Sequence, residues 1–98
     1  MKKIMTTNEI KCVLIDRFSI DTPVQVLKDK DAGRTLYLLE HVKIKDQMSV
    51  AELHGLCVRI AKALDGELYG TVNIDFATLS YGVEFEMVVE VVGENATC

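Results

Sequence analysis

The chain has 98 residues, of which 49% are apolar and 27% are charged, and its formal net charge is −4. This length and composition predict one globular domain over residues 1–98, with flexible tails at residues 1–5 and 93–98. The negative charge argues against a nucleic-acid-binding protein, which needs a basic surface. No apolar run approaches the ~18 residues of a membrane-spanning helix, so we expect no membrane partner.

The cysteines and the first residues bear on where the protein works. The cysteines are Cys12, Cys57 and Cys98, which is an odd number. Polar residues follow Met1 where a signal peptide would need an apolar core. We therefore expect reduced thiols and a cytoplasmic location.

Residues 6–18, TTNEIKCVLIDRF, carry two competing signals. Thr6 and Glu9 have the spacing of a capping box, in which each side chain accepts a hydrogen bond from the other residue's backbone N–H. One helical face would carry Ile10, Val13, Leu14 and Phe18. A strand-like alternation also runs through Ile10, Cys12, Leu14, Phe18 and Ile20. We favour the helix and keep a strand over residues 8–18 as the alternative.

Residues 23–44, PVQVLKDKDAGRTLYLLEHVKI, predict an antiparallel hairpin around the polar loop 28–34. The facing of its second strand, residues 35–44, is ambiguous. We expect the inward set to be Leu36, Leu38, Val42 and Ile44, with Glu40 as the odd member. The outward set is then Tyr37, Leu39, His41 and Lys43.

Residues 49–66, SVAELHGLCVRIAKALDG, predict an amphipathic helix. Ser49 and Glu52 form a second capping box. The apolar stripe contains Val50, Leu53, Leu56, Cys57, Ile60, Ala61 and Leu64. Gly66 stands where a left-handed residue is expected to end the helix.

Residues 71–92 predict a second hairpin with its turn at 78–82. In the last strand, one alternate set is Val83, Phe85, Met87, Val89 and Val91. This set predicts a buried face, and the acids Glu84, Glu86 and Glu90 lie on the other. Asp75, on the preceding strand, is expected to lie opposite this acidic set.

These elements predict an α+β two-layer sandwich with the order α-β-β-α-β-β. Two helices would cover one face of a mostly antiparallel four-stranded sheet. The other face of the sheet would then be open to solvent or to a partner.

Motifs for chemistry are absent from the sequence. No Cys-x-x-Cys, His-x-x-x-His or glycine-rich phosphate loop occurs. Cys57 falls in the apolar stripe and is expected to be a small core residue. We assign no catalytic, cofactor-binding or metal-binding residue and expect a protein that is not an enzyme. An enzyme that uses Cys12, His41 or His54 is the least favoured alternative.

The sequence therefore points to a binding surface. We expect a small protein–protein interaction module of the adaptor, assembly chaperone or inhibitor type, which forms a homodimer. It would act through the open, partly acidic sheet face or the edge of the last strand. The predicted partner-binding residues are Tyr37, Leu39, His41, Asp75, Glu84 and Glu86. The alternative is a regulatory domain that binds a small molecule or nucleotide, between helix and sheet or at a dimer interface.

Overall fold

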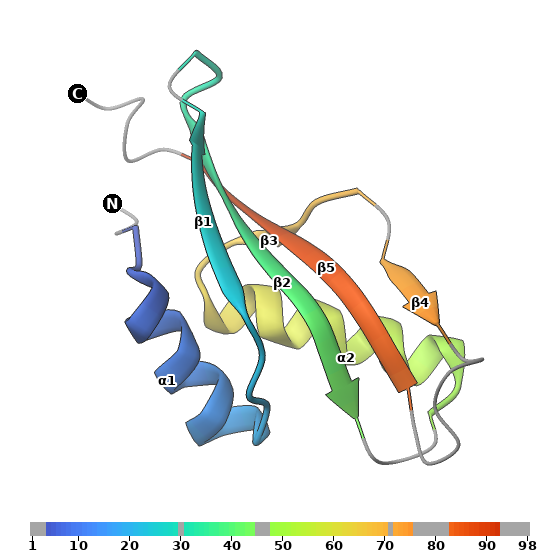
Figure 1. Ribbon diagram of the computed structural model, residues 1–98. Helices are drawn as coiled ribbons and strands as arrows, with labels where there is room; N and C mark the ends of the chain where they lie inside the picture. The colour runs from blue at the N-terminus through green and yellow to red at the C-terminus, as the bar shows by residue number, and fades with distance from the viewer. Residues whose placement is uncertain (1–3, 30, 45–47, 71, 76–82, 93–98) are drawn as a thin grey trace.

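The computed structural model describes residues 4–29, 31–44, 48–70, 72–75 and 83–92. Their elements, in chain order, are α1 (Thr7–Phe18), β1 (Val24–Asp29), β2 (Arg34–Ile44), α2 (Val50–Ala63), β3 (Glu67–Leu68), β4 (Asn73–Asp75) and β5 (Val83–Val92). Two helices and an antiparallel sheet confirm the predicted α+β class (Figure 1). The structure adds one short strand, β3, to the predicted order.

The sheet is built around β5. Its strand order is β1-β2-β5-β3, and β4 pairs with β5 as well. All of these pairings are antiparallel, with β2 along one side of β5, and β3 and β4 on the other side at different positions. Because β5 has neighbours on both sides, the predicted docking along its edge is wrong. Among the described strands, β1 is an outer strand of the sheet.

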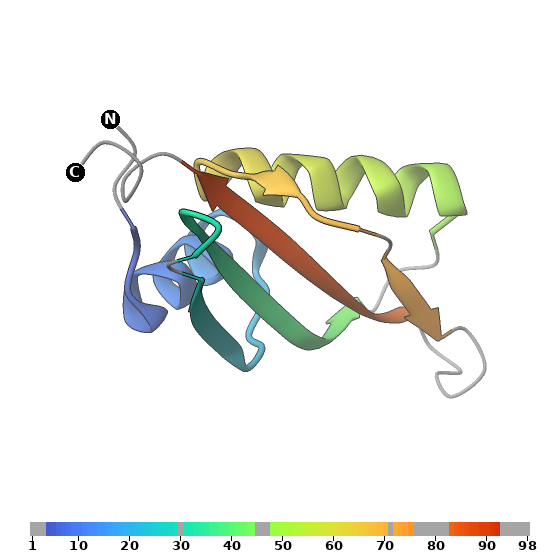
Figure 2. The ribbon, with the colours of Figure 1, turned by 90° about the horizontal axis from the view of Figure 1, so that it is seen from above.

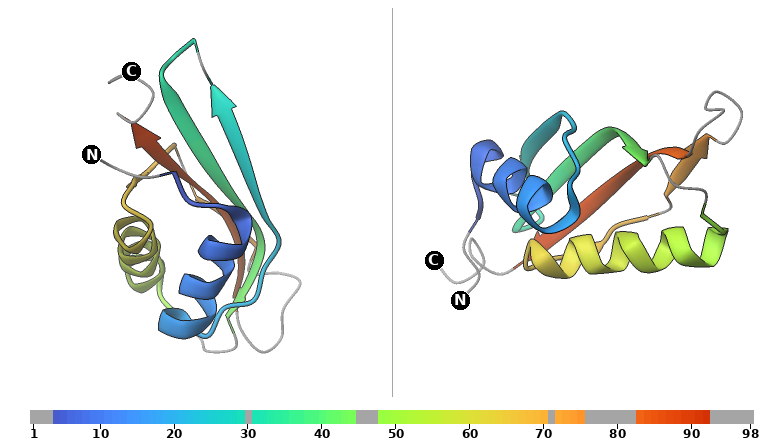
Figure 3. Two further views of the ribbon diagram at one scale, coloured as in Figure 1. Left: turned by 90° about the vertical axis from the view of Figure 1, so that its left-hand side faces the viewer. Right: turned by 90° about the horizontal axis from the view of Figure 1, so that it is seen from below.

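Both described helices lie on the same face of the sheet (Figures 2 and 3). α2 runs beneath β5 and the β3–β4 segment, and α1 lies beside it near β1. Neither described helix is long and apolar enough to cross a membrane. The arrangement leaves the opposite face of the sheet uncovered by helices.

Both predicted capping boxes form. The Glu9 N–H donates to Thr6 Oγ1 at 3.2 Å, and the Thr6 N–H donates to Glu9 Oε1 at 2.9 Å. Ser49 and Glu52 repeat this exchange at 3.1 and 3.0 Å. The first box satisfies N–H groups that only a helix start leaves free, which agrees with a helix rather than a strand here.

The end of α2 differs from the prediction at Gly66. Asp65, with φ 58°, is the left-handed residue. The Asp65 N–H donates to the Lys62 carbonyl, and the Gly66 N–H donates to the Ala61 carbonyl at 2.9 Å. Gly66 is instead needed for its size, because a Cβ at that position would lie 2.5 Å from Val89 Cγ1.

The core lies between the helices and the sheet. Its largest fully buried side chains are Tyr37, Phe85, Ile10, Leu14, Leu39, Leu53, Ile60, Leu64, Met87, Val42, Val83 and Val89. The Tyr37 hydroxyl accepts a hydrogen bond from the Met5 N–H at 2.9 Å. Ile4 and Met5 also pack against the core, although the sequence places them in a predicted flexible tail, and residues 1–3 lie outside the described residues. Residues 93–98 and the predicted turn at 78–82 lie outside the described residues.

A β-bulge in β2 reverses the facing that the sequence predicts. Leu39 pairs with Met87 and Val42 pairs with Phe85, so Glu40 and His41 together stand opposite the single residue Glu86. One extra residue shifts the alternation by one position. Odd-numbered residues therefore face the core before the bulge, and Val42 faces it afterwards.

The predicted outward facing of Tyr37 and Leu39 is therefore wrong. Both side chains are 0% exposed and lie beneath the helices. The predicted inward facing of Leu36 and Leu38 is wrong as well, because each neighbours these buried residues on the same strand. The Thr22 hydroxyl donates to the Glu40 carbonyl, and the Glu40 N–H donates to the Pro23 carbonyl at 3.2 Å, so the loop before β1 holds the bulge in place.

Candidate functional site: the open face of the sheet

We use "open face" for the sheet surface turned away from the helices. Residues directly paired across two strands share a face, so the register identifies its members. From β1 to β3 and β4, the described residues whose register partners place them on it are Gln25, Leu27, Asp29, Arg34, Leu36, Leu38, Lys43, Glu84, Glu86, Val88, Glu90, Glu67 and Asn73. The open face therefore combines an apolar centre with charged residues at both ends.

The apolar centre is a strip of four side chains. Leu27 pairs with Leu36 across β1 and β2, and Leu38 pairs with Val88 across β2 and β5. Leu27 is 47% exposed, and the other three are partly buried. We call these four residues the apolar strip. The apolar strip crosses β1, β2 and β5, and no polar residue lies between Leu36 and Leu38 on this face of β2.

One end of the open face is acidic and hollowed. A hollow of about 310 Å³ is lined by His41, Asn73, Ile74, Glu84, Phe85 and Glu86. His41 Nδ1 lies 3.0 Å from Glu84 Oε2. A second hollow of about 270 Å³ shares Asn73 and Glu86 with the first and reaches Leu38 and Val88 of the apolar strip. Acidic and apolar surfaces are thus immediate neighbours.

The other end of the open face is organised around Arg34. Its Nη1 donates to Glu90 Oε2 at 3.0 Å, and its Nε lies 3.7 Å from Asp29 Oδ2. The guanidinium also stacks on the ring of Tyr69, 4.9 Å from its centroid. The hydrogen bond to Glu90, ahead of the interaction with Tyr69, raises the pKa of Arg34 above its ordinary value. Arg34 is therefore held within the fold.

The structure brings together three of the six predicted partner-binding residues. His41, Glu84 and Glu86 lie around one hollow. Asp75 pairs with Glu84 in the backbone register, and its side chain is not described. Tyr37 and Leu39 belong to the core. Leu27, Leu36 and Leu38 were not predicted as surface residues. Glu40, a charged residue within the predicted inward set, was a signal that the alternation of β2 changes phase.

Protonation of His41 is expected to depend on Glu84. The hydrogen bond to this carboxylate, more than the nearby charges, raises the pKa of His41 above its ordinary value of 6.5. Because the pKa of His41 is raised on folding, the pair with Glu84 contributes its full stabilisation at pH values below the pKa of His41 in the unfolded state. This contribution is lost as the pH rises through the pKa of His41 in the folded state. An NMR titration of the imidazole should give a lower pKa in Glu84→Gln than in wild type. An identical titration in both proteins would contradict the pairing.

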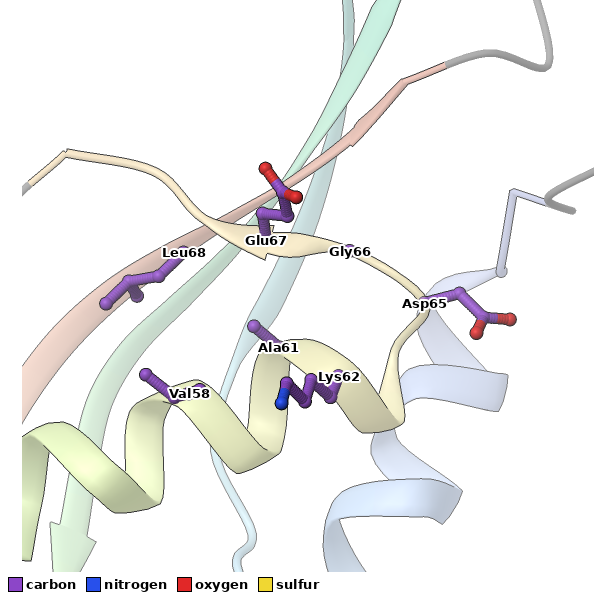
Figure 4. A pocket seen from close by; sticks show the side chains of 7 residues that line it. All are labelled: Val58, Ala61, Lys62, Asp65, Gly66, Glu67 and Leu68. Carbon is purple, nitrogen blue, oxygen red and sulfur yellow. The ribbon is translucent and has the colours of Figure 1, made fainter.

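The helix-bearing side of the molecule has its own hollows. One of about 340 Å³ lies where α2 ends and β3 begins, between Val58, Ala61 and Lys62 of the helix and Asp65, Gly66, Glu67 and Leu68 (Figure 4). Another, of about 300 Å³, is mostly apolar and is lined by Val50, Leu53, His54, Leu68, Gly70, Val72 and Ile74. This second hollow lies between the start of α2 and the β3–β4 segment.

Of the two described cysteines, Cys12 is exposed and Cys57 is buried. Burial raises the pKa of the Cys57 thiol to about 11, so it stays protonated in the core. Within the described ranges, no three or more His, Cys, Asp and Glu side chains are placed to hold a metal ion. Comparison with protein-family models, with curated proteins and with solved structures found no significant match.

Proposed function

We propose that this protein is a protein–protein interaction module whose docking surface is the open face. The observation that carries the proposal is the apolar strip, which lies in the middle of a sheet face that the helices leave uncovered. Charged residues border it at both ends. An apolar centre with a polar rim is the usual composition of a protein interface.

An adaptor, an assembly chaperone or an inhibitor is the type of protein that such a surface suits, since each acts by holding a partner. The proposal includes a cytoplasmic location. The unpaired thiols of Cys12 on α1 and Cys57 on α2 support it, because reduced cysteines are typical of that compartment.

A homodimer is also part of the proposal, and β1 is the strand through which we expect it. β1 has six residues and pairs with β2 on one side. No other described strand pairs with its outer side, so the backbone N–H and C=O groups there are offered to a second copy, and two-fold dimers are the commonest oligomers. A solution mass measurement at several concentrations tests this part of the proposal.

The docking surface is tested by removing apolar contacts from the strip. The double variant Leu27→Thr with Val88→Thr keeps residue types that favour strands. We expect it to retain partners from native lysate about tenfold less well than wild type, since buried apolar contacts near the centre of an interface dominate affinity. The measurement is quantitative mass spectrometry of proteins retained by each immobilised variant.

A matched control removes apolar surface elsewhere. Ile15→Thr with Val50→Thr changes side chains that are 50% and 63% exposed on α1 and α2, away from the open face. This control should retain the same partners as wild type. If the strip variant keeps its melting temperature and loses no partner, the open face is not the docking surface.

A regulatory domain that binds a small molecule is the second candidate. The observation that favours it is the mostly apolar hollow of about 300 Å³ between α2 and the β3–β4 segment, which Leu53, His54 and Leu68 help to line. A ligand bound only to the folded state stabilises it by mass action. A metabolite panel that raises the melting temperature of wild type, and not of Leu68→Gln, would support this candidate.

A further inference from the structure

We infer that the partner of the open face is a protein segment that presents aliphatic side chains beside lysine or arginine, and not a second copy of this chain. This inference rests on the proposed docking function and identifies the chemistry of the partner. It follows from the charge on the open face, from the pairing of Arg34 within the fold, and from the shape of its acidic end.

The open face is acidic among its described residues. Its carboxylates are Asp29, Glu67, Glu84, Glu86 and Glu90, and its permanent cations are Arg34 and Lys43. Arg34 is held by Glu90 and Asp29, whereas Lys43 stands opposite Glu84 in the backbone register and is exposed. The five carboxylates outnumber the two cations, of which Arg34 is already paired within the fold, so an excess of negative charge faces outward.

Self-association through this face would bring like charges together. A two-fold interface uses the same surface on both subunits, so acids that rim one copy would meet the acidic face of the other. Glu67 and Glu86 are exposed and would contribute most to this repulsion. Like charges across an interface cost several kcal/mol, whereas a basic partner gains from the same charges.

The hollows at the acidic end indicate how the partner's side chains are arranged. The hollow of about 310 Å³ contains Glu84 and Glu86, which can accept hydrogen bonds from a guanidinium or an ammonium group. The adjoining hollow of about 270 Å³ offers Leu38 and Val88 to an aliphatic side chain. Because the two hollows share Asn73 and Glu86, the basic and aliphatic side chains must be neighbours on the partner.

Two synthetic peptides of opposite charge test the inference directly. Each has about nine residues, one alternating leucine with lysine and the other alternating leucine with glutamate. We expect the basic peptide to bind wild type by fluorescence anisotropy, and the acidic one not to bind. Affinity should fall as salt rises from about 50 mM to about 500 mM, because exposed charges are screened.

Charge-reversal variants localise the binding. The double variant Glu84→Lys with Glu86→Lys should lower the affinity for the basic peptide at least ~10-fold, which is about 1.4 kcal/mol of binding free energy. The matched control, Asp16→Lys with Asp21→Lys, changes the net charge equally at exposed positions off the open face and should bind like wild type. Equal losses in both variants would show non-specific attraction to an acidic protein and would overturn the inference.

The lysate experiment separates this inference from the proposed function. Partners lost from Leu27→Thr with Val88→Thr should also be lost from Glu84→Lys with Glu86→Lys. If the first variant loses them and the second retains them, docking stands and the basic partner is wrong. If neither variant loses a partner, both proposals fail. If wild type is a dimer and Val88→Thr dissociates it, the open face is occupied by a second copy of the chain. This result would also overturn the inference.

Discussion

Replacing Gly66 with alanine is expected to destabilise the protein by about 3 kcal/mol, at the upper end of the cost of overpacking a core. A Cβ at this position would lie 2.5 Å from Val89 Cγ1, 2.7 Å from the Glu90 carbonyl oxygen and 3.0 Å from Val91 Cγ2. The backbone of β5 cannot move away, because β2 pairs with it on the opposite side. Urea unfolding followed by circular dichroism measures the loss.

Gly55→Ala is the matched control for this change. Gly55 lies within α2, and a Cβ there meets no atom within 4 Å. The same substitution should therefore stabilise the protein by about 0.8 kcal/mol, the difference in helix propensity between the two residues. A destabilisation of similar size at both positions would contradict the close contact between Gly66 and β5.

Leu39→Ala is expected to cost about 3 kcal/mol, within the range for a leucine removed from a packed core. Leu39 is 0% exposed and lies beneath the helices, although sequence periodicity places it on the surface. Its neighbour Leu38 belongs to the open face, so Leu38→Ala should cost about 1 kcal/mol because less apolar area is lost. Both variants lose the same strand propensity, which isolates the effect of facing.

The outcome of this comparison distinguishes the two facings of β2. If Leu38→Ala costs more than Leu39→Ala in urea unfolding, the strand has the periodicity that the sequence alone predicts, and the bulge at Glu40 and His41 is absent. Since a domain is typically stable by about 5–15 kcal/mol, the expected loss at Leu39 is large enough to measure reliably.

The parts of the fold that the sequence predicts correctly depend on local signals. Thr6 with Glu9 and Ser49 with Glu52 are three residues apart, and each pair identifies a helix start without help from tertiary structure. The alternation of Val83, Phe85 and Met87 likewise identifies the buried side of β5. These signals together determine the α+β class.

The parts that it misses depend on contacts between distant residues. The bulge is stabilised by Thr22 and Pro23, which lie far from Glu40 in the sequence. β3 has two residues and exists through its pairing with Val89 and Glu90. Neither feature has a periodicity of its own. Because the bulge changes the phase of β2, the sequence pattern assigned Tyr37 and Leu39 to the wrong face of the sheet.

The same long-range dependence affected the candidate site. Glu84 and Glu86 could be predicted because they alternate with buried residues on one strand. The apolar strip could not, since it requires the register that sets Leu27 beside Leu36 and Leu38 beside Val88. A surface assembled from three strands becomes visible only once those strands are aligned.

The central place of β5 has a consequence during synthesis on the ribosome. The β1–β2 hairpin leaves the exit tunnel well before residues 83–92, and β2 then has one long side without its neighbour. Half-formed sheets of this kind attract other nascent chains. The speed of translation over the residues between β2 and β5 therefore determines how long β2 remains without its β5 neighbour. Slow translation of these residues should lower the yield of correctly folded protein.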